Sequence, residues 1–188
     1  MTAPSPARVA AIVLAGGRSR RFGSDKLATV VGGRPLLDSA ISAAMSVAGA
    51  VVVVGPLERS LPPGVLVTRE EPAYAGPFAA VAAGLDLVDA DLVLIIAGDL
   101  LDPGGALPVL LTVLDQQPTA DAAVLIDTGG RRQPLLTACR AVSLRGCVAG
   151  VDPVGRAASE LLDGLHVIEV PDTGGWSRDV DSPADLPG

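Results

Sequence analysis

The sequence contains few of the residues that build disulfide frameworks or transition-metal sites. Among its 188 residues are two cysteines and one histidine. Cys139 and Cys147 are too few for a disulfide framework, and both are expected to behave as small buried hydrophobic residues. His166 has no cysteine or second histidine at ligand spacing, which argues against a zinc-like site. Trp176 is the only tryptophan; we expect it to pack in the core or a lid, and stacking on the ring of a ligand is the alternative.

Positive charge is also scarce. Fourteen Lys and Arg residues face 21 Asp and Glu residues, for a formal net charge of −7 and a pI near 4.6. Proteins that bind nucleic-acid backbones need a broad surplus of basic residues, so a nucleic-acid partner is not expected. The exception is local, because Arg18, Arg20, Arg21 and Lys26 fall within nine residues. This pattern indicates a small polyanionic ligand.

Long hydrophobic runs are absent apart from one uncharged stretch of 19 residues, Ser39–Leu57. It contains three serines, two glycines and a proline, and it divides into an Ala-rich helix followed by the strand Val51–Val54. We therefore expect no membrane helix. No charged-then-apolar signal sequence precedes the first predicted strand, and a cytoplasmic location is the expectation.

Short apolar runs alternate with helical segments along the chain. Residues 1–7 are predicted to be a disordered leader, and residues 8–188 to form one domain. The predicted strands are Val9–Leu14, Ala50–Val54, Val65–Thr68, Leu92–Ala97, Ala122–Ile126 and Val167–Val170. The predicted helices span about residues 35–48, 77–88, 105–115 and 155–163.

This alternation predicts a three-layer α/β/α fold with a mostly parallel sheet and right-handed crossovers. The first strand is continuously apolar and suits a central position, buried on both faces. Between Ala122–Ile126 and Pro134–Cys139 stands only a turn, 129–132, without a helix. We therefore expect an antiparallel excursion within the sheet.

The segment after the first strand has the features of a phosphate-binding loop. Gly16 and Gly17 follow the strand directly and let backbone N–H groups approach an anion. The segment is not a Walker loop, because no Gly-Lys-Ser/Thr ends it. It is not a dinucleotide-binding G-x-G-x-x-G either, because Arg18 and Arg21 occupy positions that are small there.

The segment resembles the L-A-G-G-x-S-x-R-x-G-x-D-K signature of the MobA-like nucleotidyltransferases. The matching residues are Leu14, Ala15, Gly16, Gly17, Ser19, Arg21, Gly23, Asp25 and Lys26. The resemblance continues, in the order of the family, through residues 32–37, 76–80, 98–99, 133–135 and 179–186. It implies a Rossmann-like nucleotide-binding sheet and transfer of GMP from GTP to the phosphate of molybdopterin, with release of pyrophosphate. A molybdenum-cofactor delivery protein is a further implied partner.

The resemblance also implies roles for individual residues. Lys26 and Arg21 are expected to contact the triphosphate, and Arg18 is a further candidate. The nucleotide-binding set is completed by Leu14, Ala15, Gly16, Gly17, Ser19, Glu71 and Gly76. Glu71 is a candidate for the base or ribose, with a solvated turn charge as the alternative. Asp25 is expected to orient the loop rather than to bind metal.

Carboxylates at strand ends are the candidate Mg²⁺ ligands. Asp99 follows the strand Leu92–Ala97 and Gly98, at the edge where α/β proteins bind ligands. Mg²⁺ prefers hard oxygen ligands and often takes one or two carboxylates beside substrate phosphates. A turn or capping role is the alternative for Asp99, and Asp102 is a rival ligand. Asp179 and Asp181 share one face of an extended segment and are expected to complete the metal or substrate site.

Two features keep other functions open. The family usually has Asn-x-Asn where this chain has Asp179-Val180-Asp181, and Asp-x-Asp is more typical of related cytidylyltransferases. Transfer of CMP from CTP to molybdopterin or another phosphorylated acceptor is therefore the alternative. The usual proline after the Asp99 position is also missing, since Leu100-Leu101-Asp102-Pro103 follows it. A nucleotide-binding protein without turnover is therefore a third hypothesis.

Overall fold

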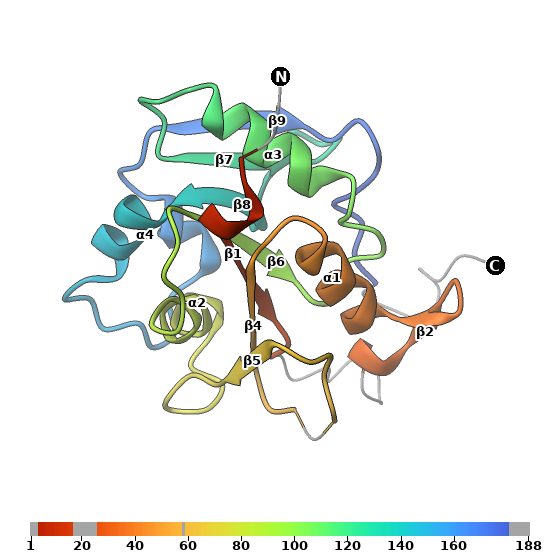
Figure 1. Ribbon diagram of the computed structural model, residues 1–188. Helices are drawn as coiled ribbons and strands as arrows, with labels where there is room; N and C mark the ends of the chain where they lie inside the picture. Colours follow the sequence, from red (N-terminus) through yellow and green to blue (C-terminus); the bar gives the residue numbers. More distant parts are fainter. Residues whose placement is uncertain (1–3, 17–25, 58, 181–188) are drawn as a thin grey trace.

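The molecule is built around a seven-stranded sheet with helices on both faces (Figure 1). The computed structural model describes residues 4–16, 26–57 and 59–180. The strand order is β5-β4-β1-β6-β8-β7-β9. The strands of this sheet are β1 (Val9–Leu14), β4 (Ala50–Val54), β5 (Val65–Thr68), β6 (Leu92–Ala97), β7 (Ala122–Ile126), β8 (Arg132–Arg140) and β9 (Val167–Pro171). The first three residues of the predicted leader lie outside the described part of the chain.

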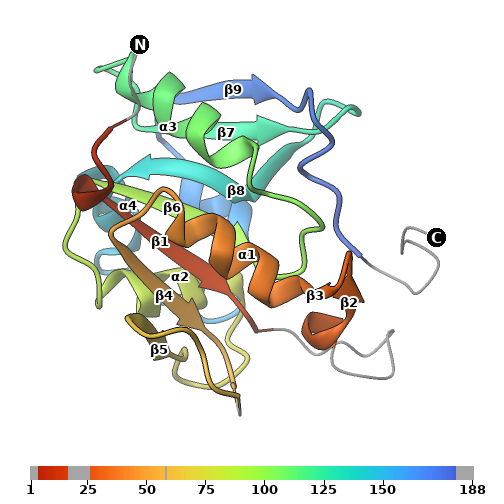
Figure 2. The ribbon, with the colours of Figure 1, turned by 45° about the vertical axis from the view of Figure 1, so that its right-hand side comes forward.

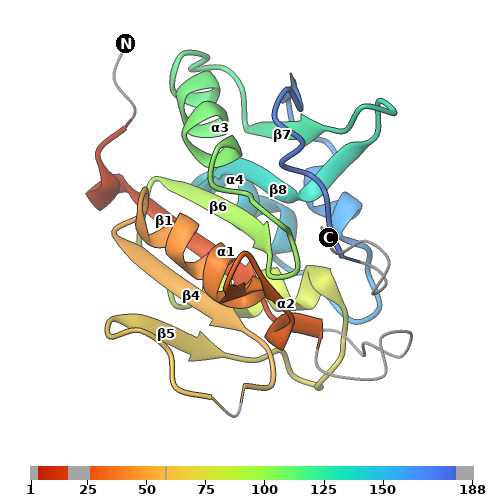
Figure 3. The same cartoon turned by 90° about the vertical axis from the view of Figure 1, so that its right-hand side faces the viewer.

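The predicted strands are confirmed, and so is the antiparallel excursion. Within the seven-stranded sheet, four strand pairs are parallel, and β8 runs antiparallel to its neighbours β6 and β7. β1 lies in the middle of the parallel part, and its six residues are all buried. Figure 3 shows the sheet twisting from β5 to β7.

Helices cover the two faces separately. The α-helices of the described residues are α1 (Leu36–Met45), α2 (Pro77–Leu85), α3 (Ala106–Asp115) and α4 (Ala141–Val148). In Figure 2, α1 and α3 lie in front of the sheet and α2 and α4 behind it. Two hydrophobic clusters match these layers, because one includes apolar residues of α1 and α3 and the other those of α2 and α4.

The alternating burial of the central strands explains this arrangement. In β1, and in β6 as far as Ile96, successive residues enter opposite clusters, so each strand packs against the helices on both faces of the sheet. Leu107, Leu110, Leu111 and Leu114 form the buried stripe of α3 at helical spacing. The uncharged stretch considered for a membrane is α1 followed by β4, and no helix among the described residues has the length and apolarity to cross a bilayer.

Short elements complete the fold. They are the 3₁₀ helices η1 (Pro6–Arg8), η2 (Lys26–Ala28) and η3 (Ala158–Leu162) and the two-stranded hairpin of β2 (Val30–Val31) and β3 (Arg34–Pro35). The helix predicted over residues 155–163 is only the 3₁₀ turn η3, and α4 was not predicted. Leader residues from Pro6 onward form η1, directly before β1.

Candidate active site

The carboxyl ends of β1 and β6 bring the basic segment and Asp99 together. The two strands are parallel neighbours, and the Gly98 amide donates a hydrogen bond to the Leu14 carbonyl at 2.9 Å. A Cβ at Gly98 would lie 2.7 Å from the oxygen of Leu14. Only glycine allows this close approach, which fixes Asp99 beside the start of the glycine-rich segment.

Lys26 and Asp99 form an ion pair at this edge. The Lys26 Nζ lies 2.8 Å from Asp99 Oδ2, and the two side chains are 12% and 28% exposed. Lys26 is the first residue of η2, so the chain returns to the sheet edge at this lysine. Lys26, which the sequence predicts to contact the triphosphate, and Asp99, which it predicts to bind metal, thus lie side by side.

A cavity of about 480 Å³ opens beside this pair. Its walls are mostly apolar, as expected of a site for a flat heterocycle. It is lined by Leu14, Gly16, Leu27, Glu70, Ala73, Tyr74, Gly76, Pro77, Ala80, Ala97, Asp99 and Leu135. Among the predicted nucleotide-binding residues, Leu14, Gly16 and Gly76 line it, so strands β1 and β6 and the start of α2 meet at one pocket.

Glu70 places a second carboxylate in the cavity wall, at a position that no sequence pattern distinguishes. Its residue is 5% exposed, and Oε1 accepts a hydrogen bond from the Tyr74 amide at 3.0 Å. Its Oε2 is buried and has no hydrogen-bond partner among the described residues. An unpaired buried acceptor is costly, so a ligand with N–H donors would stabilise it.

Tyr74 is held in an unusual conformation next to this carboxylate. Its φ is +65°, the one positive value at a non-glycine residue of the described chain, and half of the residue is exposed. Such conformations cluster at ligand sites. The hydrogen bond to Glu70 holds the Tyr74 backbone in place, with the ring beside the cavity.

Other predicted residues lie elsewhere. Ala15 is buried but does not line the cavity; Glu71 and Asp102 are exposed and are absent from its lining. Asp179 is exposed and pairs through its backbone with Leu100, the residue after Asp99. The predicted site residues Gly17, Arg18, Ser19, Arg21, Asp25 and Asp181 lie outside the described residues.

The chemistry of Asp99 fits a Mg²⁺ that is held mainly by substrate phosphates. Its Oδ2 is paired with Lys26, while its Oδ1 accepts no hydrogen bond from the described residues. In the described part of the chain, no group of three or more His, Cys, Asp or Glu residues could hold a metal ion. Mg²⁺ commonly binds one or two carboxylates beside substrate phosphate oxygens.

Comparison with known proteins identifies the family. The model of the MobA-like NTP transferase domain matches residues 11–161, which include most of β1, the basic segment, the residues that line the cavity, and α4. The chain belongs to this family. The resemblance carried by the glycine-rich segment is thereby confirmed.

A curated relative of this MobA-like chain is the "Probable molybdenum cofactor guanylyltransferase" of Chloroflexus aggregans. The two are 34% identical over 137 residues. The aligned part covers 69% of this chain and 64% of the relative, which is just under two thirds of the relative's length.

Solved structures of several nucleotidyltransferases share the fold of the MobA-like chain. The homologue of Mycobacterium tuberculosis Rv0371c from Mycobacterium sp. strain JC1 has a TM-score of 0.74 at 21% identity, covering 95% of this chain and 92% of its own. Molybdopterin-guanine dinucleotide biosynthesis protein A from Archaeoglobus fulgidus has a TM-score of 0.64 at 19% identity, with 94% of each chain covered. The 2-C-methyl-D-erythritol 4-phosphate cytidylyltransferase from Thermus thermophilus has a TM-score of 0.66 at 19% identity, covering 93% and 94%. At these identities the likeness shows the shared fold alone.

Proposed function

We propose that this protein is a Mg²⁺-dependent guanylyltransferase that transfers GMP from GTP to the phosphate of molybdopterin. The observation that carries the choice of base is the buried Glu70 carboxylate, whose Oε2 has no partner among the described residues. The Watson–Crick edge of guanine presents two adjacent donors, N1–H and the 2-amino group. Cytosine presents a single amino donor on that edge. A carboxylate in the cavity wall is therefore better matched by guanine.

The name of the Chloroflexus relative supports the same acceptor and nucleotide. The apolar lining from Leu14, Leu27 and Ala80 suits the faces of a purine ring. At the other end of the reacting nucleotide, Lys26 supplies a positive charge for the triphosphate. Asp99 is the proposed Mg²⁺ ligand, and Asp179 is a candidate second ligand through its position beside Leu100.

The proposed reaction needs no covalent nucleophile on the protein. An oxygen of the acceptor phosphate forms a bond to the α-phosphorus, and the bond from that phosphorus to the bridging oxygen breaks, so that its electron pair leaves with pyrophosphate. A bound Mg²⁺ would supply charge that stabilises the phosphate oxygens in this step. Lys26 would bind the leaving group electrostatically, and Asp99 would orient the metal-bound nucleotide.

Transfer of CMP from CTP is the second candidate, and the acidic Asp179-Val180-Asp181 segment favours it. The two are separated by pyrophosphate release from GTP and from CTP with Mg²⁺, each with and without molybdopterin. Acceptor-dependent release from GTP alone is the expected result. Preference for CTP would replace GMP by CMP transfer, and GTP binding without any release would favour a binding protein.

Glu70→Gln tests the base assignment directly. The neutral amide keeps one acceptor and adds a donor that opposes the guanine N–H groups. We expect the KM for GTP to rise about tenfold, as for loss of one good base contact. Glu71→Gln, one residue away and exposed, separates the two assignments. A larger rise of the KM for GTP in Glu71→Gln than in Glu70→Gln would indicate that Glu71, and not Glu70, contacts the base.

A further inference from the structure

The segment 172–180 returns from the end of β9 to residues 99–101, here called the Asp99 loop, and pairs with them. The Leu101 amide donates to the Arg178 carbonyl at 2.9 Å, and the Val180 amide donates to the Asp99 carbonyl at 3.4 Å. Between these bonds, Leu100 and Asp179 form an antiparallel bridge. Three consecutive residues of the Asp99 loop are thus held by the returning segment.

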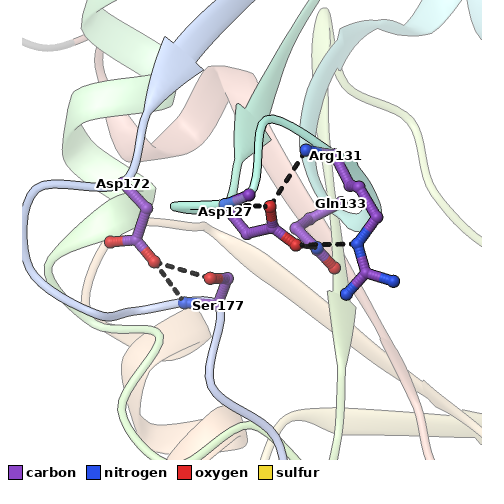
Figure 4. Close-up of polar contacts among 6 residues, drawn as sticks. Asp127, Arg131, Gln133, Asp172 and Ser177 are labelled. Atoms are coloured by element: carbon purple, nitrogen blue, oxygen red, sulfur yellow. Dashed lines mark hydrogen bonds and ion pairs between the residues drawn. The ribbon is translucent and has the colours of Figure 1, made fainter.

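A single carboxylate organises the turn that directs this return. Asp172 Oδ1 accepts hydrogen bonds from the amides of Gly174 and Trp176 at 3.1 and 3.0 Å. Its Oδ2 accepts from the Ser177 amide and hydroxyl at 2.8 and 2.6 Å (Figure 4). Four donors from three residues therefore converge on Asp172, which itself is tied to β7 through its amide and the Ile126 carbonyl at 2.9 Å.

Trp176 joins the same turn to the body of the protein. Its indole lies so close to Gly105 and Gly174 that a Cβ at either position would be 2.3 or 2.2 Å from it. Gly105 caps the start of α3, and Trp176 packs against the cluster that includes the buried face of α3. The turn is thus anchored by Asp172 on one side and by the indole on the other, immediately before the residues that pair with the Asp99 loop.

We propose that Asp172 is a positioning residue for Asp99. By fixing the turn 172–177, it holds residues 178–180 against residues 99–101 and so sets the direction in which the Asp99 carboxylate meets the metal-bound nucleotide. The inference rests on the proposed function, in which Asp99 orients the nucleotide. Small displacements of such groups reduce rates strongly, because the reacting atoms must be aligned.

The neighbouring strand offers a matched control. Asp127 follows β7 as Asp172 follows β9, and it also organises a turn with its carboxylate (Figure 4). It accepts from the amides of Gly129 and Arg131, both at 2.9 Å, and from Gln133 Nε2 at 2.9 Å. Its turn closes the β7–β8 hairpin, and none of these hydrogen bonds reaches residues 99–101.

Asp172→Ala and Asp127→Ala should be compared first without substrate, by hydrogen exchange in the unliganded protein. In Asp172→Ala, we expect exchange in residues 99–101 and 176–180 to accelerate at least about tenfold, as local protection is lost. The fluorescence of Trp176, the only tryptophan, should shift to the red. In Asp127→Ala, the faster exchange should be confined to residues 127–133.

Kinetics then separate positioning from general destabilisation. In Asp172→Ala, kcat should fall about tenfold, and the Mg²⁺ concentration needed for half-maximal activity should rise. The KM for GTP should stay within about twofold of the wild-type value. Ser177→Ala removes one of the four donors to Asp172 and should lower kcat by a smaller factor. This variant tests the inference even if Asp172→Ala folds poorly. Unchanged exchange at residues 99–101, or an equal loss of kcat in Asp127→Ala, would overturn the inference. A wild-type protein without pyrophosphate release would overturn the proposed function, whereas the exchange data on the unliganded protein would still decide whether Asp172 holds the Asp99 loop.

Discussion

Lys26 and Asp99 are paired with each other, but their variants should fail in different ways. Lys26→Ala removes the positive charge that would meet the triphosphate, so the Kd for GTP should rise at least about tenfold, as expected for a charged contact. Asp99→Asn keeps an oxygen that can accept a hydrogen bond from Lys26, but it loses the negative charge of the carboxylate that is proposed to bind Mg²⁺. It should lower kcat at least about a hundredfold, as for loss of metal charge stabilisation, and leave the fold intact.

Isothermal titration with GTP and circular dichroism would measure these effects separately from turnover. Full activity in Asp99→Asn would remove Asp99 from the proposed metal site, and an unchanged Kd in Lys26→Ala would remove Lys26 from the triphosphate site. Both outcomes are interpretable because each side chain is partly exposed, 12% and 28%, rather than part of the core.

The sequence placed Asp99 and Lys26 correctly at the sheet edge because each follows from a strong local pattern. Asp99 comes directly after a buried strand, and Lys26 ends a signature of fixed spacing. Glu70 could not be separated from Glu71 in the same way, because both stand in the irregular segment between β5 and α2. Without a helical or strand period, the sequence does not indicate which of two adjacent carboxylates is buried.

At the scale of elements, replacement by alanine should lower the free energy of unfolding at one glycine and raise it at another. Gly98→Ala brings a Cβ within 2.7 Å of the Leu14 carbonyl and 3.1 Å of Leu37 Cδ1. The contact between β1 and β6 must then open, and we expect the free energy of unfolding to fall by about 1–3 kcal/mol, as for overpacking. Gly146 lies inside α4, and nothing approaches its Cβ position within 4 Å.

Gly146→Ala should therefore raise the free energy of unfolding by about 0.5–1 kcal/mol, through helix propensity and a more restricted unfolded chain. Urea unfolding of both variants measures the two differences. A stabilising Gly98→Ala would show that the β1–β6 contact relaxes without strain, and a destabilising Gly146→Ala would show that α4 contributes little helix in solution.

Elements with weak patterns were the ones that the sequence did not predict. α4 is short and buries only Ala141 and Leu144, so its apolar stripe is too brief to be recognised. η3 buries only Leu161 and Leu162 and lies between Gly155 and Gly164, both with positive φ, which limits it to a 3₁₀ turn. In both cases, packing against the sheet determines the structure more than local propensity does.

An irregularity within β8 also had no sequence signal. The register of β7 against β8 jumps from Thr137, opposite Val124, to Gln133, opposite Leu125. Leu135 lies in the intervening bulge and lines the cavity. Because the apolar run around it is continuous, the sequence predicts an ordinary strand and misses the displacement that brings Leu135 to the site.

At the scale of the whole molecule, the strand order explains why the site is where it is. β1 is flanked by β4 on one side and by β6 on the other. After β1, the chain forms β4 and β5 on one side of it and then crosses to form β6 on the other side. Open α/β sheets bind ligands at such switch points, outside the carboxyl ends of the strands. The cavity opens here, between Leu14 of β1 and Ala97 at the end of β6. The central place of β1 was predictable from its uninterrupted apolar residues, and the location of the site follows from it.

The response of the whole molecule to acid should depend on three aspartates whose carboxylates accept hydrogen bonds, Asp121 from distant segments and Asp127 and Asp172 within turns. Hydrogen bonds from Ser143 and the His166 amide lower the pKa of Asp121, and those from the Arg131 and Gly129 amides lower the pKa of Asp127. Burial raises the pKa of Asp172, but the hydrogen bonds from Ser177, Trp176 and Gly174 outweigh it and keep that pKa below its usual value.

Because these pKa values are lower in the folded than in the unfolded protein, the stability that they confer is fully present above the unfolded-state pKa. It is lost as the pH falls through the folded-state values. We expect the urea midpoint to be nearly constant from about pH 7 to pH 5 and to fall below about pH 4. Asp121→Asn should destabilise the protein more at neutral pH than at about pH 3, because at pH 3 the unfolded chain already binds protons and part of the stabilisation by the charged Asp121 carboxylate is lost. Asp86→Asn, at an exposed residue after α2, is the control. If the difference between Asp121→Asn and wild type were the same at both pH values, Asp121 would not contribute to the acid sensitivity, and the hydrogen bonds from Ser143 and His166 would stabilise the fold independently of its charge.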